Sequence, residues 1–374
     1  MWFPLTIASL WIPPKHLGKL GCLIEEHWNV LCEAATRDTM IGFRRVGILR
    51  AFDGFSDDAI WAAVEAKRNA AVPEGEDIRK SRVAQLKIEE WDVFTHPDAD
   101  RNSRDFRLRP VVAPPGYEHY IEKVVLVERL RVVKALTGFT RIGSPGDYGD
   151  LSEVPDLHRA PLARSSPTWV PAAEVRGEGI FIQLREDAVQ EWLSQPRVIT
   201  RANQLNAAHI EFRRLRGILP YDDEFAVARY ALIHSLSHSL IRQFSIDCGY
   251  SAASIQERIY SASGDDTNEA MAGVLLYTAA ADSEGTLGGL VALGEPRTLA
   301  NHLDQALERT RLCASDPLCS EHSAKADGLT LHGAACHACM FVSETSCERG
   351  NKYLDRTFLV ETMTGISTPF FPND

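Results

Sequence analysis

The 374-residue sequence lacks the patterns that mark several large classes of protein. It contains no run of about 20 apolar residues, so no membrane span is predicted. Its apolar N-terminus has no basic segment before it, which argues against a secretory signal. Neither G-x-x-x-x-G-K-[ST] nor G-x-G-x-x-G occurs, so a P-loop ATPase is excluded. We also find no internal repeat and no convincing Ser/His/Asp or Cys/His constellation, which favours a non-catalytic protein.

Positive charge is also in short supply. The 40 Lys and Arg residues are outnumbered by 51 Asp and Glu residues, which gives a net charge of -11. A surface that coats nucleic acid through charge alone is therefore not expected, although a local basic groove remains compatible with this balance. The hydrophobic content of 45% is ordinary for a globular protein, and the length allows two or three lobes.

Cysteine is concentrated in one block near the C-terminal end. Five of the eight cysteines fall there, namely Cys313, Cys319, Cys336, Cys339 and Cys347. The C-x-x-C spacing of Cys336 and Cys339 lets two thiolates hold one metal ion from a tight turn, and structural zinc needs four such ligands. Cys319 and Cys347 form the natural second pair, with Cys313 as a fifth candidate. We therefore predict a structural Zn²⁺ site.

The sequence also favours one cysteine as the fourth zinc ligand and a reduced state for the thiols. Cys319 is favoured over Cys313 because it lies beyond the Asp316-Pro317 turn, which can fold it back, whereas Cys313 is still attached to a predicted helix. Disulfides would need an oxidising compartment, which nothing in the sequence indicates, and a redox C-x-x-C would need a thioredoxin-like βαβ context. We expect a reduced, cytoplasmic protein.

Hydrophobic periodicity predicts an α+β fold. We expect a mixed N-terminal lobe over residues 1–195 and a C-terminal lobe over 196–374 that a cysteine-rich zinc site closes. Strands are predicted over 1–14, 172–184, 255–262 and 271–280, and helices over 16–35, from Ser56 onward, from Glu186 to Trp192, 225–246 and 297–312. Residues 82–95 suggest a helix running into a strand, and residues 121–142 a strand of about seven residues followed by a helix. A chain that opens directly in a strand is also compatible with an upstream domain.

Two histidines on the most apolar predicted helix offer an alternative chemistry. His234 and His238 are four residues apart, so both imidazoles lie on one helical face, as in H-E-x-x-H metalloproteases. Ser235 stands where the glutamate base should be, although Glu257 is a possible carboxylate elsewhere. A metal-dependent hydrolase is thus an alternative function, while buried, hydrogen-bonded histidines are the favoured interpretation.

The most basic short stretch lies at residues 97–110. It contributes Arg101, Arg104, Arg107 and Arg109. A solvated loop is the simpler interpretation, and a phosphate-contacting loop is the alternative because the guanidinium fork matches phosphate oxygens. Arg213, Arg214 and Arg216 on an amphipathic segment are a second candidate group for phosphate contact, although pairing with carboxylates is the favoured interpretation for them.

Several phrases of the sequence together resemble a known family. They are WFPLTIASLWIPP, VERLRVVKALTGFTRI and WVPAAEVRGEGIFIQL upstream, then HSLSHSLI, ERIY, LLYTAAADSEGTLGGL, CASDPLC and ACHACMFVSETSCERGNKYLDR. In this order they resemble the DrmB subunits of the DISARM antiphage systems, and the cysteine block resembles the zinc-binding domain that closes MrfA-type superfamily 2 helicases. CASDPLC departs from the denser cysteine grouping of those helicases.

The resemblance implies a function as well as a fold. It implies a non-catalytic accessory subunit that partners a superfamily 2 helicase (DrmA-like) and engages DNA through that complex during defence against phage. It also implies chains longer than this one, with additional N-terminal sequence. A structural or regulatory module whose partner is not a helicase is a further alternative.

Overall fold

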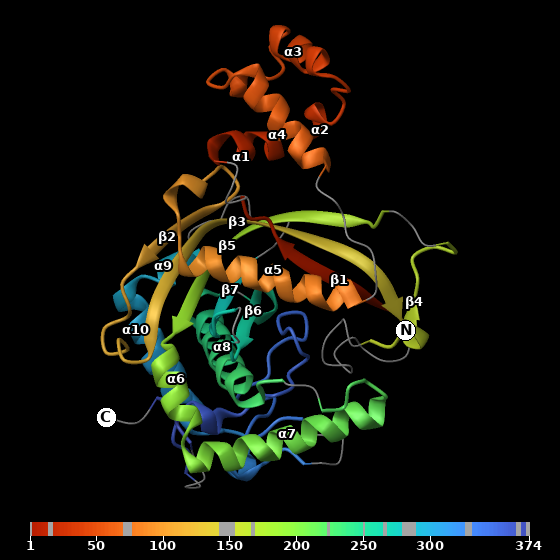
Figure 1. The fold of residues 1–374 in the computed structure, drawn as a ribbon. Helices are drawn as coiled ribbons and strands as arrows, with labels where there is room; N and C mark the ends of the chain where they lie inside the picture. Colours follow the sequence, from red (N-terminus) through yellow and green to blue (C-terminus); the bar gives the residue numbers. More distant parts are fainter. Residues whose placement is uncertain are drawn as a thin grey trace.

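One antiparallel sheet organises the computed structural model, which describes residues 2–13, 18–69, 77–141, 154–165, 169–222, 225–249, 251–264, 268–278, 289–325, 331–363 and 368–371. In this part of the chain seven strands form the sheet, in the order β1-β3-β5-β7-β6, with β2 and β4 also paired to β3 (Figure 1). The strands are β1 (Phe3–Leu10), β2 (Arg107–Val111), β3 (Ile121–Thr140), β4 (Arg159–Ala160), β5 (Ala172–Leu184), β6 (Ile255–Ala262) and β7 (Met271–Thr278).

β3 is the longest strand of the sheet, at 20 residues. It pairs with β1 and β2 along one edge and with β5 and β4 along the other, so strand partners flank both its halves and take up its backbone groups. The expectation that a helix replaces its second half is therefore wrong. β5 in turn pairs with β7, from Gly179 opposite Tyr277 to Gln183 opposite Gly273, so strands before and after residue 195 share one sheet.

A layer of helices covers one face of the sheet. It consists of α6 (Glu186–Leu193), α8 (Val227–Cys248) and α9 (Gly289–Leu293), while α7 (Pro196–Arg216) and α10 (Pro296–Arg311) pack against α8. The alternation along β5 directs Ile180, Ile182 and Leu184 into this layer, where they join the apolar residues of α8 in the largest buried cluster. α8 is therefore buried against the sheet, as its continuous apolar sequence predicts.

α5 (Asp77–Thr95) covers the opposite face (Figure 1). Its Trp91 and Phe94 rings lie 5.7 and 5.0 Å from the ring of Phe181, the β5 residue that points away from the other layer. A buried ion pair fastens the helix to β6, since Arg258 Nη2 donates to Glu90 Oε1 at 2.7 Å. The expected strand at the end of residues 82–95 is wrong, because this aromatic segment packs as a helix.

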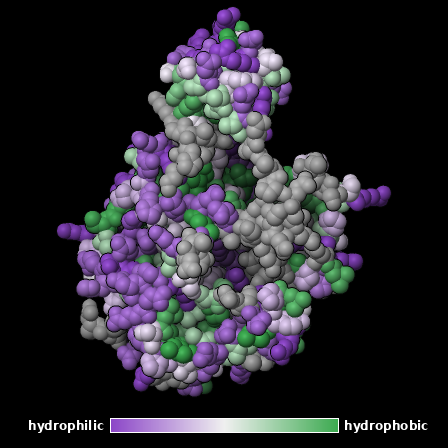
Figure 2. Space-filling model, in the orientation of Figure 1, coloured by the Kyte–Doolittle hydropathy of each residue, from purple (hydrophilic) through white to green (hydrophobic). Residues whose placement is uncertain are grey.

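A small helical module lies between β1 and α5. It comprises α1 (Gly18–Glu26), α2 (Trp28–Leu31), α3 (Arg37–Arg45) and α4 (Asp57–Asn69). Ser56 caps α4 as predicted, because the Ala59 amide donates to Ser56 Oγ at 3.2 Å. The module has its own buried cluster, centred on Ile24, Phe52 and Ile60. It stands above the rest of the molecule in Figure 2 and carries a mixture of hydrophilic and hydrophobic residues on its surface.

Short 3-10 turns complete the described part of the chain: η1 (Arg50–Phe52), η2 (Ala99–Arg101), η5 (Asp156–His158), η6 (Ala252–Ser254), η8 (Pro317–Glu321) and η9 (Arg356–Phe358). The predicted α+β class is confirmed by these helices and the antiparallel sheet. The predicted lobe boundary at 195/196 falls between α6 and α7 and stays a prediction. None of the helices in the described ranges has the length and apolar character that a membrane span requires.

Candidate metal centre

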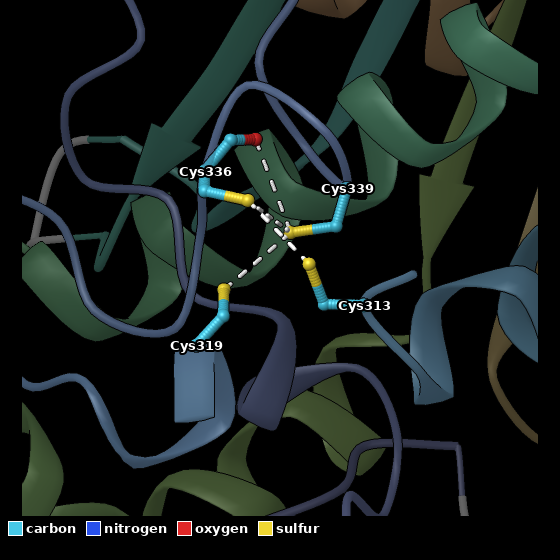
Figure 3. A group of neighbouring side chains, drawn as sticks. All are labelled: Cys313, Cys319, Cys336 and Cys339. Atoms are coloured by element: carbon cyan, nitrogen blue, oxygen red, sulfur yellow. Dashed lines mark hydrogen bonds between the residues drawn. The ribbon is translucent and has the colours of Figure 1, made fainter. Parts of the chain in front are cut away.

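Four cysteine side chains converge near the C-terminal end of α10. Figure 3 shows Cys313, Cys319, Cys336 and Cys339 pointing toward one another. The Sγ–Sγ distances are 3.6 Å for Cys313–Cys336, 3.7 Å for Cys319–Cys339 and 3.6 Å for Cys336–Cys339. Four sulfurs around one zinc ion at 2.3 Å in a tetrahedron would be about 3.8 Å apart. The spacing thus fits one tetrahedral ion and is far too long for a disulfide, whose S–S bond is about 2.05 Å.

Two of the four cysteines follow directly from α10. Cys313 is two residues beyond the helix, and Arg356 fixes that helix end by donating to the carbonyls of Thr310 and Arg311 at 2.9 and 3.0 Å. Cys319 lies in η8, which Asp316 caps by accepting from the Leu318 amide at 2.9 Å. The predicted turn at Asp316 is thus present, and it brings Cys319 toward the cluster while the helix end brings Cys313.

The other two cysteines lie on a tight turn. The amides of Cys339 and Met340 both donate to the Cys336 carbonyl, at 3.3 and 3.0 Å. Two side chains of α8 contact this turn. Arg242 Nη1 donates to Phe341 O at 3.0 Å, and His238 Nδ1 lies 2.9 Å from Met340 O. Met340 and Phe341 extend the turn beyond the second cysteine, so the central helix positions the C-x-x-C pair.

A buried carboxylate ties this turn to two helices. Asp355 accepts from Arg201 Nε of α7 at 2.7 Å and from the Ala334 amide at 3.2 Å, and its own amide donates to Ser235 Oγ of α8 at 2.9 Å. Gly333 permits this approach, since a Cβ there would lie 1.9 Å from Asp355 Oδ2. The residues just before Cys336 are therefore held by the protein core, independently of any ion.

The electrostatic surroundings of the sulfurs differ. Burial raises the pKa of the Cys319 thiol to about 11, although the positive charge of Arg356 opposes the rise. Burial likewise raises the pKa of Cys339, which the neighbouring Cys319 increases further. Burial alone would raise the pKa of Cys336, but hydrogen bonds from the amides of Cys339 and Ala338 outweigh it and lower that pKa. The thiol form of Cys319 and Cys339 is thus favoured without a cation, and a cation must displace their protons to bind.

The donor set indicates what this centre can do. Four sulfurs favour a soft or borderline ion such as zinc, and a site with four protein ligands leaves no position for water or substrate. Cys336 and Cys339 are half-buried beside a pocket of about 460 Å³ that Cys319, Cys336, His322 and His332 help to line. The centre is therefore structural in character and can be reached from one side.

Cys347, predicted as a ligand of the same ion, lies in a different cluster. Its Sγ is 3.1 Å from Nε2 of His234 and accepts from the Asn351 amide at 3.2 Å. Cys313 instead occupies the fourth position among the described cysteines around Cys336 and Cys339. The reason is geometric, since Cys347 follows the turn onto the surface of α8, while Cys313 faces the turn from the end of α10.

The two histidines of the alternative hydrolase are fully buried. His234 and His238 are both 0% exposed and face Glu257 of β6, with Glu257 Oε1 at 3.0 Å from His234 Nε2 and 3.6 Å from His238 Nε2. The favoured interpretation, buried histidines bonded to a neighbouring loop, is confirmed by the contact of His238 with the Met340 carbonyl. A substrate cannot reach imidazoles in this position without local opening.

The predicted basic stretch is divided by the fold. Arg101 is buried, and Arg109 pairs with Glu128 and Glu295 at 2.7 and 2.6 Å, which raises its pKa. Arg104 and Arg107 are exposed, although Arg107 also pairs with Glu128 at 3.0 Å. The cross-strand partner of Arg107 is the exposed Arg129, whose Nη1 donates to the Arg104 carbonyl at 3.2 Å. We call Arg104, Arg107 and Arg129 the β2–β3 arginine group.

The second arginine group is engaged within the protein. Arg213 is buried and donates to the Pro220 carbonyl at 2.7 Å. Arg214 pairs with Glu211 at 3.2 Å, and Arg216 stacks over the ring of Phe212. The expectation that this group pairs with carboxylates is confirmed for Arg214.

Comparison with known proteins assigns this centre to a class. Residues 236–340 match the family described as the MrfA Zn-binding domain, a segment that contains all four clustered cysteines and excludes Cys347. The chain thus carries a zinc-binding domain of the MrfA type. It is also 35% identical over 289 residues to DISARM protein DrmB of Bacillus paralicheniformis, covering 77% of this chain and 49% of that protein. The chain is a relative of DrmB, as its sequence predicts, and it spans about half the length of that relative.

One solved structure is also similar. It is the crystal structure of DUF1998 helicase MrfA bound to DNA, at 9% identity, with 67% of this chain and 25% of that chain covered and a TM-score of 0.29. A score this low does not define a shared fold.

Several supporting residues were not predicted from the sequence. Arg242 and Arg356 hold the turn and the end of α10, and Asp355 connects the turn to α7 and α8. A weak signal existed for Arg242, which is one of two arginines in a mainly apolar helix and needs a polar partner. Arg129 was hidden in a stretch that was predicted only in part as a strand.

Proposed function

We propose that this chain is a non-catalytic accessory subunit of a DISARM-type antiphage complex, in which it partners a superfamily 2 helicase and helps that helicase engage DNA. The similarity to DISARM protein DrmB carries the proposal, since it extends over 77% of the chain. The curated relative is about twice as long, so any contact made by its remaining half is outside this proposal.

The four-cysteine centre serves this role as a structural element. Its cysteines would hold zinc, which on binding supplies a rigid fourfold cross-link and no open coordination position. The cross-link joins the end of α10, η8 and the turn that α8 supports. A surface built on these three elements is thereby fixed for a partner.

The β2–β3 arginine group is the proposed contact to DNA. Arg107 and Arg129 lie opposite each other on neighbouring strands, and Arg104 precedes β2 by three residues. Arg104 has an exposed side chain with no carboxylate within ion-pair distance in the described ranges. The net charge of -11 opposes long-range attraction to a polyanion, so we expect weak binding by this chain alone and tight binding only with the helicase.

The test is an electrophoretic mobility shift with and without a DrmA-like superfamily 2 helicase. The chain should co-elute with the helicase in size-exclusion chromatography and should increase its affinity for DNA. Changing Arg104, Arg107 and Arg129 together to Ala should make the slope of log K against log salt less steep by up to about 3, since each phosphate that an arginine neutralises adds about 0.9 to that slope.

Arg214→Ala is the matched control, because Arg214 is an exposed arginine on α7 that pairs with Glu211. It should leave the salt dependence unchanged. Failure to co-elute with any such helicase would contradict the accessory role. Tight DNA binding by the chain alone, unaffected by the triple substitution, would contradict the proposed contact.

A further inference from the structure

The buried cluster around Cys347 has the composition and geometry of a second metal site. We propose that this chain binds a second divalent transition-metal ion of the zinc type, held by His234, His238, Glu257 and Cys347. The four potential ligand atoms all lie within 4.8 Å of one another, and every one of these residues is buried. The proposal does not depend on the function proposed above.

The distances agree with those around a single ion. Zinc ligands at 2.0–2.3 Å in a tetrahedron are separated by about 3.3–3.6 Å when nitrogen, oxygen and sulfur are mixed. Nε2 of His234 lies 3.0 Å from Glu257 Oε1 and 3.1 Å from Cys347 Sγ, and Nε2 of His238 lies 3.6 Å from the same carboxylate oxygen. Small outward shifts of these side chains would accommodate the ion.

The hydrogen bonds of His238 determine where its lone pair points. Its Nδ1 faces the Met340 carbonyl at 2.9 Å, and a carbonyl can only accept, so Nδ1 carries a proton. In the neutral imidazole Nε2 then bears a lone pair, and this atom has no hydrogen-bond partner among the described residues. This lone pair faces Glu257 Oε1, and two electron-rich atoms repel each other. A cation bound between them would turn that repulsion into attraction. Metal-bound histidines typically donate their other ring N–H to a carbonyl or carboxylate in this way.

Glu257 needs a cation for a second reason. Its side chain is 0% exposed, and within 4 Å the described residues offer it two imidazoles but no lysine or arginine. Ser237 Oγ and the Glu348 amide donate to its oxygens, which orients the carboxylate without neutralising it. A buried carboxylate that is oriented but not paired with a fixed positive charge is costly, and a divalent ion removes that cost.

The lack of a hydrogen-bond partner at Nδ1 of His234 supports neither a bound metal ion nor a cluster held by hydrogen bonds alone. It has no hydrogen-bond partner in the described part of the chain, whichever atom or ion Nε2 contacts. His238, Glu257 and the distances between the ligand atoms therefore carry the support for the ion.

The proposed ion would join three parts of the fold. His234 and His238 come from α8, Glu257 from β6, and Cys347 from the segment after the C-x-x-C turn. With four protein ligands the site is closed and structural. His238 would link the two centres, because its Nε2 faces the second ion while its Nδ1 holds the carbonyl next to Cys339.

The first experiment uses the unmodified full chain. Elemental analysis for all first-row transition metals should find two ions per chain in freshly purified protein. X-ray absorption at the zinc edge should then show five sulfur ligands and three nitrogen or oxygen ligands shared between the two ions. One ion per chain in an all-sulfur environment would overturn the proposal, and this measurement needs no variant to fold.

The second experiment separates the two centres. Cys347→Ser retains a hydrogen-bond acceptor for the Asn351 amide and should lower the metal content from two ions to one, leaving an all-sulfur spectrum. Cys336→Ser should remove the other ion and leave a spectrum rich in nitrogen and oxygen. Cys32→Ser, at an exposed cysteine outside both clusters, is the matched control and should retain both ions. Two ions in folded Cys347→Ser, with an unchanged spectrum, would also overturn the proposal.

Discussion

Asp355 offers the sharpest test of how the cysteine turn is held. We predict that Asp355→Asn destabilises the protein strongly although it changes no more than one oxygen to an amide group. Oδ1 accepts from the amides of Ala334 and Thr357, and an asparagine oxygen in that position would keep both hydrogen bonds. Oδ2 accepts from Arg201 Nε at 2.7 Å, and an asparagine NH₂ there would face a donor.

The magnitude follows from the burial of this pair. The side chains of Arg201 and Asp355 are 6% and 0% exposed, so Arg201 would remain charged and buried without its counterion. Removing one partner of a buried pair costs about 3–5 kcal/mol. Arg201 keeps its hydrogen bond to the His322 carbonyl, which places the expected loss toward the lower end of that range.

The assay is urea unfolding, combined with hydrogen exchange of peptides from residues 331–363. The control is Asp58→Asn, since Asp58 pairs with Arg37 at 2.8 Å on the surface, with side chains 84% and 42% exposed. Such a pair contributes about 0–1 kcal/mol. A loss in Asp355→Asn no larger than in this control would refute the view that Asp355 anchors the turn.

Three further predictions concern metal, pH and domain structure. Cys313→Ser and Cys339→Ser should each lower the metal content by one ion per chain and increase proteolysis of residues 313–347, measured by elemental analysis and mass spectrometry. Burial lowers the pKa of His302 below 6.5 despite the nearby Asp247, so the unfolded chain binds a proton at this residue more readily than the folded chain does. The free energy of unfolding should therefore fall as pH drops below about 6.5. Urea titrations at pH 7.5 and 5.5 should show a smaller fall for His302→Gln than for the unmodified protein. Because β5 pairs with β7, a chain cleaved between residues 195 and 205 should stay associated in size-exclusion chromatography, whereas separation into two stable fragments would support independent lobes.

Local patterns predicted most elements of this fold and failed where tertiary pairing decides. α8, α10, β5, β6 and β7 were identified from periodicity and length, because burial enforces a regular apolar pattern. The second half of β3 contains Leu130, Lys134 and Leu136, residues that also form helices well, and only its pairing with β1 and β5 makes it a strand. Such pairing partners lie more than 30 residues away and leave no local signal.

The candidate site was likewise predictable where local spacing defines it and not where tertiary structure does. The cysteine block and its C-x-x-C turn were evident because metal ligands need close spacing. Whether Cys313 or Cys347 joins Cys336 depends on the direction in which the chain leaves α10 and crosses α8, which spacing does not encode. The partial burial of the arginine stretch was hidden for a similar reason, because Glu128 and Glu295 approach it from other elements.

The helical module between β1 and α5 has a consequence for how this protein folds and varies. β1 pairs with β3 at Phe3 and Thr140, so the chain must close a loop of more than 100 residues before that edge of the sheet forms. Loop-closure entropy grows only logarithmically, by about 0.6 kcal/mol for each doubling of length. The module can therefore lengthen, shrink or be exchanged for another at small thermodynamic cost, while the late pairing of β1 slows folding. Among relatives we expect this position to be the one where chain length varies most freely.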